Sequence, residues 1–183
     1  MKKILLTTLI IFSSLLNAQY IKVTPNGYVL GDGDNGLIID IPNKTASELY
    51  TNTLDFINKN YNNPDDKVFA KTENKYIRFT TIDYKIFPIK TILGDSWVSG
   101  YTTYEIDFKD NKIRVYSINP YMYRGDYTNS YDFKCGLFNS IYTCKGQLKK
   151  EAAKNHVVEN IEAYYNNFFN ALKIHLSEKN NDW

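Results

Sequence analysis

The stretch YEIDFKDNKIRV, which occupies residues 104–115, decides the fold of this chain. Apolar side chains alternate with charged ones on both sides of Asp110 and Asn111, as in two strands that each bury one face. Asp and Asn favour tight turns, because their side chains bond to nearby backbone and tolerate left-handed conformations. We therefore expect an antiparallel hairpin with a turn at this pair. Its buried face consists of the apolar positions Tyr104, Ile106, Phe108, Ile113 and Val115.

The same alternation extends upstream of the hairpin. We expect strands at 67–72 and 75–82, and a third strand through residues 87–93. Pro88 in this third strand indicates an edge position or a bulge, because proline cannot donate to the hydrogen-bond ladder. Residues 68–118 are therefore predicted to form an antiparallel meander of four to five strands with one dry face.

Two amphipathic helices are expected to cover this sheet. A strand at 37–41 comes first, and Thr45 with Glu48 three residues later then forms a capping box, which predicts a helix start. Residues 147–179 repeat apolar side chains at helical spacing and predict a long C-terminal helix. An apolar stripe this wide must be buried, and we expect it to pack against one face of the sheet. The predicted fold is therefore α+β, a curved antiparallel sheet with both helices on one face.

The N-terminus has the pattern of a secretory signal peptide. Lys2 and Lys3 precede an uncharged run from Ile4 to Leu16, and Ala18 is the small residue expected at the cleavage site. The run is shorter than the about 20 residues of a membrane-spanning helix. No cysteine lies near the cut. We expect a periplasmic or secreted protein that is not a lipoprotein and has no stable membrane insertion after cleavage.

These patterns divide the 183 residues into four parts. Residues 1–18 are the signal peptide, and residues 19–36 are a turn-rich leader segment with at most one short strand, near 28–30. One α+β domain follows. It occupies residues 37–179, with a cysteine-bearing loop insertion at about 119–147, and residues 180–183 form a tail.

The charge balance argues against nucleic acid as a partner. The chain has 22 Lys and Arg residues against 20 Asp and Glu residues. Loss of Lys2 and Lys3 with the signal leaves the mature protein formally neutral. Binding to a phosphate backbone depends on a clustered excess of Lys and Arg, which no segment of this sequence provides.

Cys135 and Cys144 lie in the predicted insertion. An even cysteine count in an oxidising compartment favours a disulfide, and a loop of this size would contribute about 2–3 kcal/mol. Two free buried thiols or a metal site are the alternatives. A metal would need further ligands, and His156 and His175 are too isolated to supply them. We expect a structural disulfide, no metal and no cofactor.

Three further motifs receive ordinary structural interpretations. The glycine and aspartate run at 31–36 resembles a calcium loop but has Asn43 where the final glutamate is required, so we expect a solvated turn. The tripeptide Arg-Gly-Asp at 124–126 is interpreted as turn chemistry. His175 lies on the apolar stripe of the last helix and is expected at the edge of the core.

The sequence contains no nucleophile elbow, zinc-protease motif or phosphate loop, so we do not expect an enzyme.

The order of these elements resembles a family of exported bacterial proteins with a domain of unknown function, described as having a fold like the TATA-box binding protein. The resemblance covers about 37–118 and 150–178, and rests on the strand at 37–41, the hairpin at 104–115, the C-terminal helix and the capped helix. The capped helix contributes Glu48, Leu49, Tyr50, Leu54, Phe56 and Ile57. The resemblance implies a TBP-like fold and no chemistry, and a shared fold does not transfer DNA binding.

The sheet face opposite the helices is the predicted ligand-binding surface, because an uncovered sheet with aromatic and charged groups can hold a ligand or a partner. The residues expected there are Tyr76, Arg78, Lys90, Glu105, Asp107, Arg114 and Tyr116. The alternative is an ordinary solvated face of mixed charge. The loop at 119–147 is a second candidate surface, since eight of the sixteen tyrosines lie between residues 101 and 142.

We expect the domain to be a non-enzymatic binding or interaction module. Its partner would be an unknown small ligand or an envelope protein. The alternative function is an extracytoplasmic hydrolase in which Glu105 and Asp107 supply acid and base catalysis. A deep pocket around two carboxylates would favour the hydrolase, and a shallow open sheet would favour the binding module.

Overall fold

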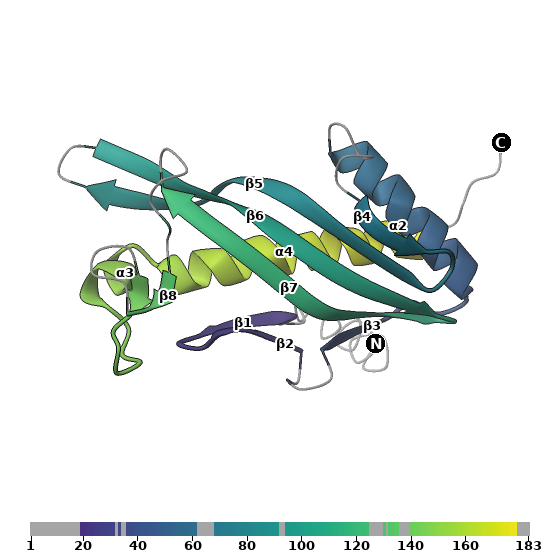
Figure 1. Cartoon of the computed structure of the whole chain (residues 1–183), viewed down its shortest axis with the longest axis horizontal. Helices are drawn as coiled ribbons and strands as arrows, with labels where there is room; N and C mark the ends of the chain where they lie inside the picture. Colours follow the sequence, from purple (N-terminus) through teal and green to yellow (C-terminus); the bar gives the residue numbers. More distant parts are fainter. Residues whose placement is uncertain are drawn as a thin grey trace, which may run out of the picture.

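A five-stranded antiparallel sheet and two long helices form the body of the molecule (Figure 1). This computed structural model describes residues 19–31, 33, 36–61, 68–91, 94–124, 130, 132–135 and 140–178. The strands lie in the order β3-β7-β6-β5-β4. Their bounds are β3 Leu37–Asp40, β4 Val68–Thr72, β5 Tyr76–Thr91, β6 Gly94–Lys109 and β7 Lys112–Arg124.

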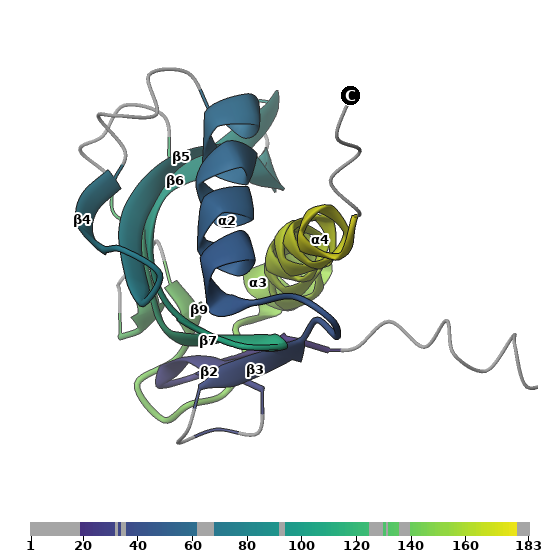
Figure 2. The ribbon, with the colours of Figure 1, turned by 90° about the vertical axis from the view of Figure 1, so that its right-hand side faces the viewer.

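The helices α2 (Ala46–Asn60) and α4 (Val157–Ser177) both lie inside the curve of this sheet (Figure 2). The predicted α+β fold, a curved antiparallel sheet with both helices on one face, is confirmed. The face of the sheet turned away from the helices is called the outward face below. Among the described residues, no helix is both long and apolar enough to cross a membrane.

The hairpin at 104–115 is present, and its two strands are longer than predicted. β6 and β7 pair from Val98 opposite Arg124 to Lys109 opposite Lys112. The predicted loop therefore begins too early at residue 119, because residues 119–124 continue β7. Pro120 is tolerated there, since β3 pairs only with residues 112–115 and leaves this part of β7 at the sheet edge.

The strands predicted at 75–82 and 87–93 are one strand, β5, with an irregularity in its middle. Its pairing with β6 shifts between Asp83 and Phe87, where Lys85 has a left-handed φ of 56°. The extra residues of this bulge interrupt the alternation on which the prediction depended. Pro88 lies beyond the last residue that β4 pairs, Phe79, so its predicted edge position is confirmed.

The predicted leader segment contains a two-stranded hairpin instead of at most one strand. β1 (Ile21–Thr24) pairs with β2 (Gly27–Leu30), and Ile21 is 1% exposed. The backbone N–H groups of Tyr20 and Ile21 donate to the Asn166 amide oxygen of α4 at 2.7 and 3.1 Å. The hairpin is therefore part of the core, although its strands are too short to show a clear alternation.

The predicted C-terminal helix at 147–179 is divided in two. A short helix, α3 (Lys150–Lys154), precedes α4, and His156 between them has a left-handed φ of 50° that breaks the helix. Two short strands of the insertion, β8 (Asp132–Lys134) and β9 (Ser140–Tyr142), pair in parallel. The predicted loop insertion therefore contains two short strands, β8 and β9, with a parallel pairing that a tight hairpin turn cannot form.

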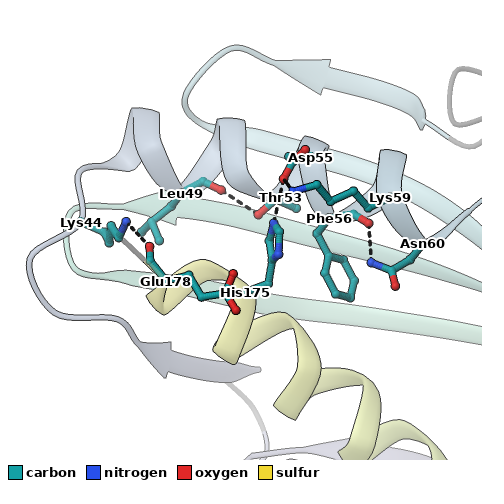
Figure 3. A network of polar contacts seen from close by, with 9 residues as sticks. All are labelled: Lys44, Leu49, Thr53, Asp55, Phe56, Lys59, Asn60, His175 and Glu178. Atoms are coloured by element: carbon teal, nitrogen blue, oxygen red, sulfur yellow. Dashed lines mark hydrogen bonds and ion pairs between the residues drawn. The ribbon is translucent and has the colours of Figure 1, made fainter. Parts of the chain in front are cut away.

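Polar contacts join α2 to α4 (Figure 3). His175 Nε2 lies 3.1 Å from Asp55 Oδ2, and the Lys44 ammonium donates to the Glu178 carbonyl at 2.7 Å. The His175 side chain is 19% exposed, as expected for a residue at the edge of the core. The capping box predicted at Thr45 is confirmed, because both of its reciprocal hydrogen bonds are present. These contacts join α2 and α4 into the helical layer that covers the inner face of the sheet.

Candidate functional site

Six of the seven predicted surface residues lie together on the outward face. The sheet register places Tyr76 opposite Asp107 and Arg78 opposite Glu105. It also places Asp107 opposite Arg114, and the Arg114 guanidinium lies 2.5 Å from the Asp107 carboxylate. We call this group the sheet-face cluster, and its members are Tyr76, Arg78, Glu105, Asp107, Arg114 and Tyr116.

Two tyrosine rings and a second ion pair complete the sheet-face cluster. Tyr76 and Tyr116 stack with ring centroids 6.3 Å apart, and the Arg114 guanidinium lies 5.5 Å from the Tyr116 ring centroid. The Tyr76 hydroxyl donates to Glu105 at 3.3 Å, and Arg78 lies 3.9 Å from the same carboxylate. Desolvation raises the pKa of both tyrosine hydroxyls, so both remain protonated donors at neutral pH.

Lys90, the seventh predicted residue, lies far from the other six and is not part of the sheet-face cluster. It pairs with Asp95 at the far end of β5. Fourteen residues of strand separate it from Tyr76, about 45 Å at the usual rise. Its backbone N–H donates to the Asn155 side chain at the α3–α4 junction. The sequence analysis placed Lys90 and Tyr76 on two separate strands, whereas both belong to β5, which is 16 residues long.

A second group of side chains on the outward face is aromatic. On β6 the residues 98, 100, 102 and 104 are buried, so the intervening odd-numbered positions face outward. Tyr101 and Tyr121 are paired in the register, and Tyr123 lies 5.8 Å from the Tyr101 ring and 6.3 Å from the Tyr121 ring. Trp97 extends this row along β6, with the Lys85 ammonium 5.8 Å from its ring. We call Trp97, Tyr101, Tyr121 and Tyr123 the aromatic stripe. Within it Trp97 and Tyr121 are exposed, Tyr101 is half-buried and Tyr123 is buried, at 4% exposed.

The aromatic stripe joins two surfaces that the sequence analysis treated as alternatives. Tyr121 and Tyr123 belong to the predicted tyrosine-rich loop, yet in β7 they lie on the same face as the sheet-face cluster. Thr80 and Thr103 lie between the two groups, with their hydroxyl oxygens 2.6 Å apart. The alternation of Tyr121, Met122 and Tyr123 carried the signal that could have revealed this arrangement.

Two hollows border residues of the sheet-face cluster. One has a volume of about 340 Å³ and is lined by Tyr116 and Ile118 of β7 and by residues of the β2 region, including Tyr28. A smaller hollow of about 120 Å³ lies beside Asp107 and Arg114, with Ile38 and two lysines around it. Neither hollow is lined by both Glu105 and Asp107, and each of these carboxylates lies beside a guanidinium. This geometry does not favour acid–base catalysis by the pair.

A buried carboxylate lies on the helix side of the sheet, where the sequence predicted no polar group. Asp83 is 2% exposed and accepts hydrogen bonds from Thr102 and, at 2.8 Å, from Thr81. The Tyr165 hydroxyl of α4 bonds to Thr102 at 2.8 Å, so a hydroxyl chain leads from the helix to the carboxylate. Burial raises the pKa of Asp83. No sequence motif brings these positions together, since they come from two strands and a distant helix.

The two cysteines are free and exposed in the structure, so the predicted disulfide is not present. The two thiols are nevertheless neighbours. A hydrogen bond with Cys144 is the largest of the effects that raise the pKa of Cys135. No group of three or more His, Cys, Asp or Glu residues that could hold a metal occurs in the described part of the chain. The motifs at 31–36 and 124–126 lie partly outside the described residues.

Taken together, the fold and its exposed face define an α+β domain with a curved antiparallel sheet that is covered on one side. No protein-family model and no curated protein matches the sequence. A solved structure of a DUF4468 family protein from Bacteroides ovatus ATCC 8483 is similar to this chain, with a TM-score of 0.50 and 13% sequence identity. The match covers 80% of this chain and 86% of that chain. The likeness agrees with the expected domain of unknown function and is one of fold alone.

Proposed function

We propose that this protein is an exported, non-enzymatic binding module that holds its ligand or partner on the outward face. The observation that carries the proposal is the grouping of guanidinium and aromatic side chains on a face that α2 and α4 leave uncovered (Figure 2). Tyr116 is 41% exposed, Tyr121 is 48% exposed and Trp97 is 43% exposed. Single exposed apolar residues are ordinary, but a contiguous group marks a binding surface.

The residue types on this face support binding. Tyr, Trp and Arg are the side chains most enriched among residues that dominate binding energy, because each combines a large contact area with hydrogen-bonding groups. The sheet-face cluster supplies two Arg and two Tyr side chains, and the aromatic stripe adds the accessible rings of Trp97, Tyr101 and Tyr121. The long strands hold these groups in a fixed order, so little conformational entropy is lost when a ligand binds.

Export is the part of the proposal that rests on the first eighteen residues. A cut after Ala18 would leave Gln19 as the first residue and Tyr20 as the first buried one, at 5% exposed. The mature chain would therefore keep the whole β1–β2 hairpin and its bonds to Asn166. A cut at this place is compatible with the core that the described residues form.

The proposal is tested by capturing components of the producing cell's own envelope extract on the mature protein. The test variant is Arg114→Ala with Tyr116→Ala, which removes the centre of the sheet-face cluster. The matched control is Ile174→Ala, because this α4 residue is 64% exposed and lies on a different element. We expect the control to retain a component that the double variant loses. Equal retention by both proteins, or by neither, contradicts the proposed surface.

A further inference from the structure

We propose that the outward face binds one extended, uncharged, polyhydroxylated chain, such as a neutral polysaccharide, along the aromatic stripe and onto the sheet-face cluster. This inference rests on the proposed function and adds the chemical class of the ligand. The shape of the face, its exposed aromatic rings and the balance of its charges support it.

The shape of the face fits a single chain better than a folded partner. From Trp97 to Asp107, the outward positions of β6 extend over ten residues, or about 34 Å. Side chains of β5, β6 and β7 make the strip about 15 Å wide, so its area is about 500 Å². A stable protein interface needs about 800 Å² on each partner. The strip is long and narrow, which suits an extended ligand.

The rings that the aromatic stripe offers to a ligand are the exposed Trp97 and Tyr121 and the half-buried Tyr101. Tyr123 is 4% exposed and packs against Tyr101 and Tyr121, with ring centroids 5.8 and 6.3 Å away. Each tyrosine combines an apolar ring face with a polar hydroxyl. A sugar ring has the matching pair of features, a flat C–H face and hydroxyl groups at its rim, and can pack against such side chains.

The polar groups of the face match an uncharged partner. Arg114 is paired with Asp107, and Arg78 lies beside Glu105, so the guanidinium charges are balanced by carboxylates on the same surface. An anionic polymer would meet both carboxylates. Hydroxyl groups of a ligand, in contrast, can donate to the carboxylates and accept from the guanidinium groups and from hydroxyls such as Thr80 and Thr103.

A peptide is a poorer fit to this face. Extended peptides bind sheets by adding to an edge, where backbone N–H and C=O groups are open to pairing. The outward face presents side chains, and β6 is paired on both sides by β5 and β7. A peptide lying across it would find no open backbone groups of β6 with which to pair.

The test is affinity electrophoresis of the mature protein through gels containing one soluble polysaccharide each. The neutral probes are dextran, laminarin, galactomannan and xyloglucan, and the anionic probe is polygalacturonate. We expect at least one neutral probe to retard the protein, and Tyr121→Ala to weaken that binding by about fivefold or more. Ile174→Ala, at a comparably exposed apolar position on α4, should bind like the unaltered protein. Both substitutions are at exposed positions, and circular dichroism verifies that both variants are folded.

Three outcomes overturn the polysaccharide proposal: no retardation by any neutral probe, retardation by polygalacturonate alone, and retardation that Tyr121→Ala does not change. The envelope capture experiment separates this failure from failure of the proposed function. If Arg114→Ala with Tyr116→Ala abolishes capture of a protein while no polysaccharide binds, the outward face is a binding surface for a protein. If the variants alter neither assay, both proposals fail.

Discussion

Asp83 is the residue whose environment departs furthest from that of an ordinary side chain of its type. Its carboxylate is buried beneath α4 and meets hydroxyl groups in place of a cation, and burial raises its pKa. The tyrosines that face it, among them Tyr164 and Tyr165, stay protonated at neutral pH because their own pKa values are raised. Asp83 is therefore the carboxyl group of this network, and its raised pKa favours the protonated form in the folded state.

Stability should therefore fall as the pH rises through the Asp83 titration. Folding favours the protonated form, so the contribution of this group is fully present below its unfolded pKa of about 3.8 and is lost above the raised folded pKa. Asp83→Asn should remove this pH dependence, because the amide does not ionise. Urea unfolding at several pH values from about 4 to 8 measures it. A pH dependence that is unchanged in Asp83→Asn would contradict the assignment.

Tyr104 and Tyr165 offer a matched pair of tests in the same core. The Tyr104 hydroxyl is buried and has no hydrogen-bond partner among the described residues, whereas the Tyr165 hydroxyl bonds to Thr102. Tyr104→Phe should raise the free energy of unfolding by about 1 kcal/mol, because an unsatisfied buried hydroxyl is lost. Tyr165→Phe should lower it by about 1–2 kcal/mol. Chemical denaturation compares the two variants, and the reverse order would refute this interpretation.

At the scale of elements, the approach of β3 to β7 depends on Gly36. This residue has a φ of 73°, and a Cβ atom there would lie 2.5 Å from the Val115 carbonyl oxygen. Gly27 has a φ of 114° but no heavy atom within 4 Å of such a Cβ. Gly36→Ala should therefore cost at least about 2 kcal/mol, and Gly27→Ala about 1 kcal/mol from backbone strain alone. Thermal unfolding of both variants measures the difference, and equal losses would contradict it.

Elements with local signals could be predicted from the sequence. The hairpin at 104–115 has alternation and a turn pair, and the start of α2 has Thr45 and Glu48 at the right spacing. Elements shaped by distant partners could not. The bulge near Lys85 depends on pairing with β6, and residues 119–124 form a strand because β6 lies beside them. The sheet-face cluster lies largely on strands with local signals, so it was predicted. The aromatic stripe depends on the pairing of residues 119–124 with β6, so it was missed.

The β8–β9 region leads to a prediction about redox state. Cys135 and Cys144 are exposed, reduced neighbours in the structure. We expect incubation with glutathione disulfide to join them, with loss of both thiol hydrogens to two molecules of glutathione, and to stabilise the protein by about 2–3 kcal/mol. Thiol titration after unfolding should then find no free thiol. The single variants Cys135→Ser and Cys144→Ser keep one reactive thiol and serve as controls. Two titratable thiols after oxidation would rule out the bridge.

At the scale of the whole molecule, the two faces of the sheet differ in what covers them. The face inside the curve is closed by α2, α4 and the β1–β2 hairpin, and holds large buried rings such as Tyr104, Phe79 and Phe87 (Figure 2). The same strands also fix the positions of the side chains on the outward face, because alternate residues of each strand point to opposite faces. The packing that stabilises the core therefore also positions the sheet-face cluster and the aromatic stripe.

The last prediction concerns the N-terminus of the whole protein. When a cell produces the full chain, we expect the exported form to begin at Gln19, because the cut after Ala18 follows the apolar run and leaves Tyr20 free to bond Asn166. Leu9→Arg places a charge in the middle of that run and should keep the protein in the cytoplasm with Met1 attached. N-terminal sequencing of both fractions measures this. An unaltered chain that stays in the cytoplasm and still begins at Met1 would contradict export, and with it the choice of envelope components as partners.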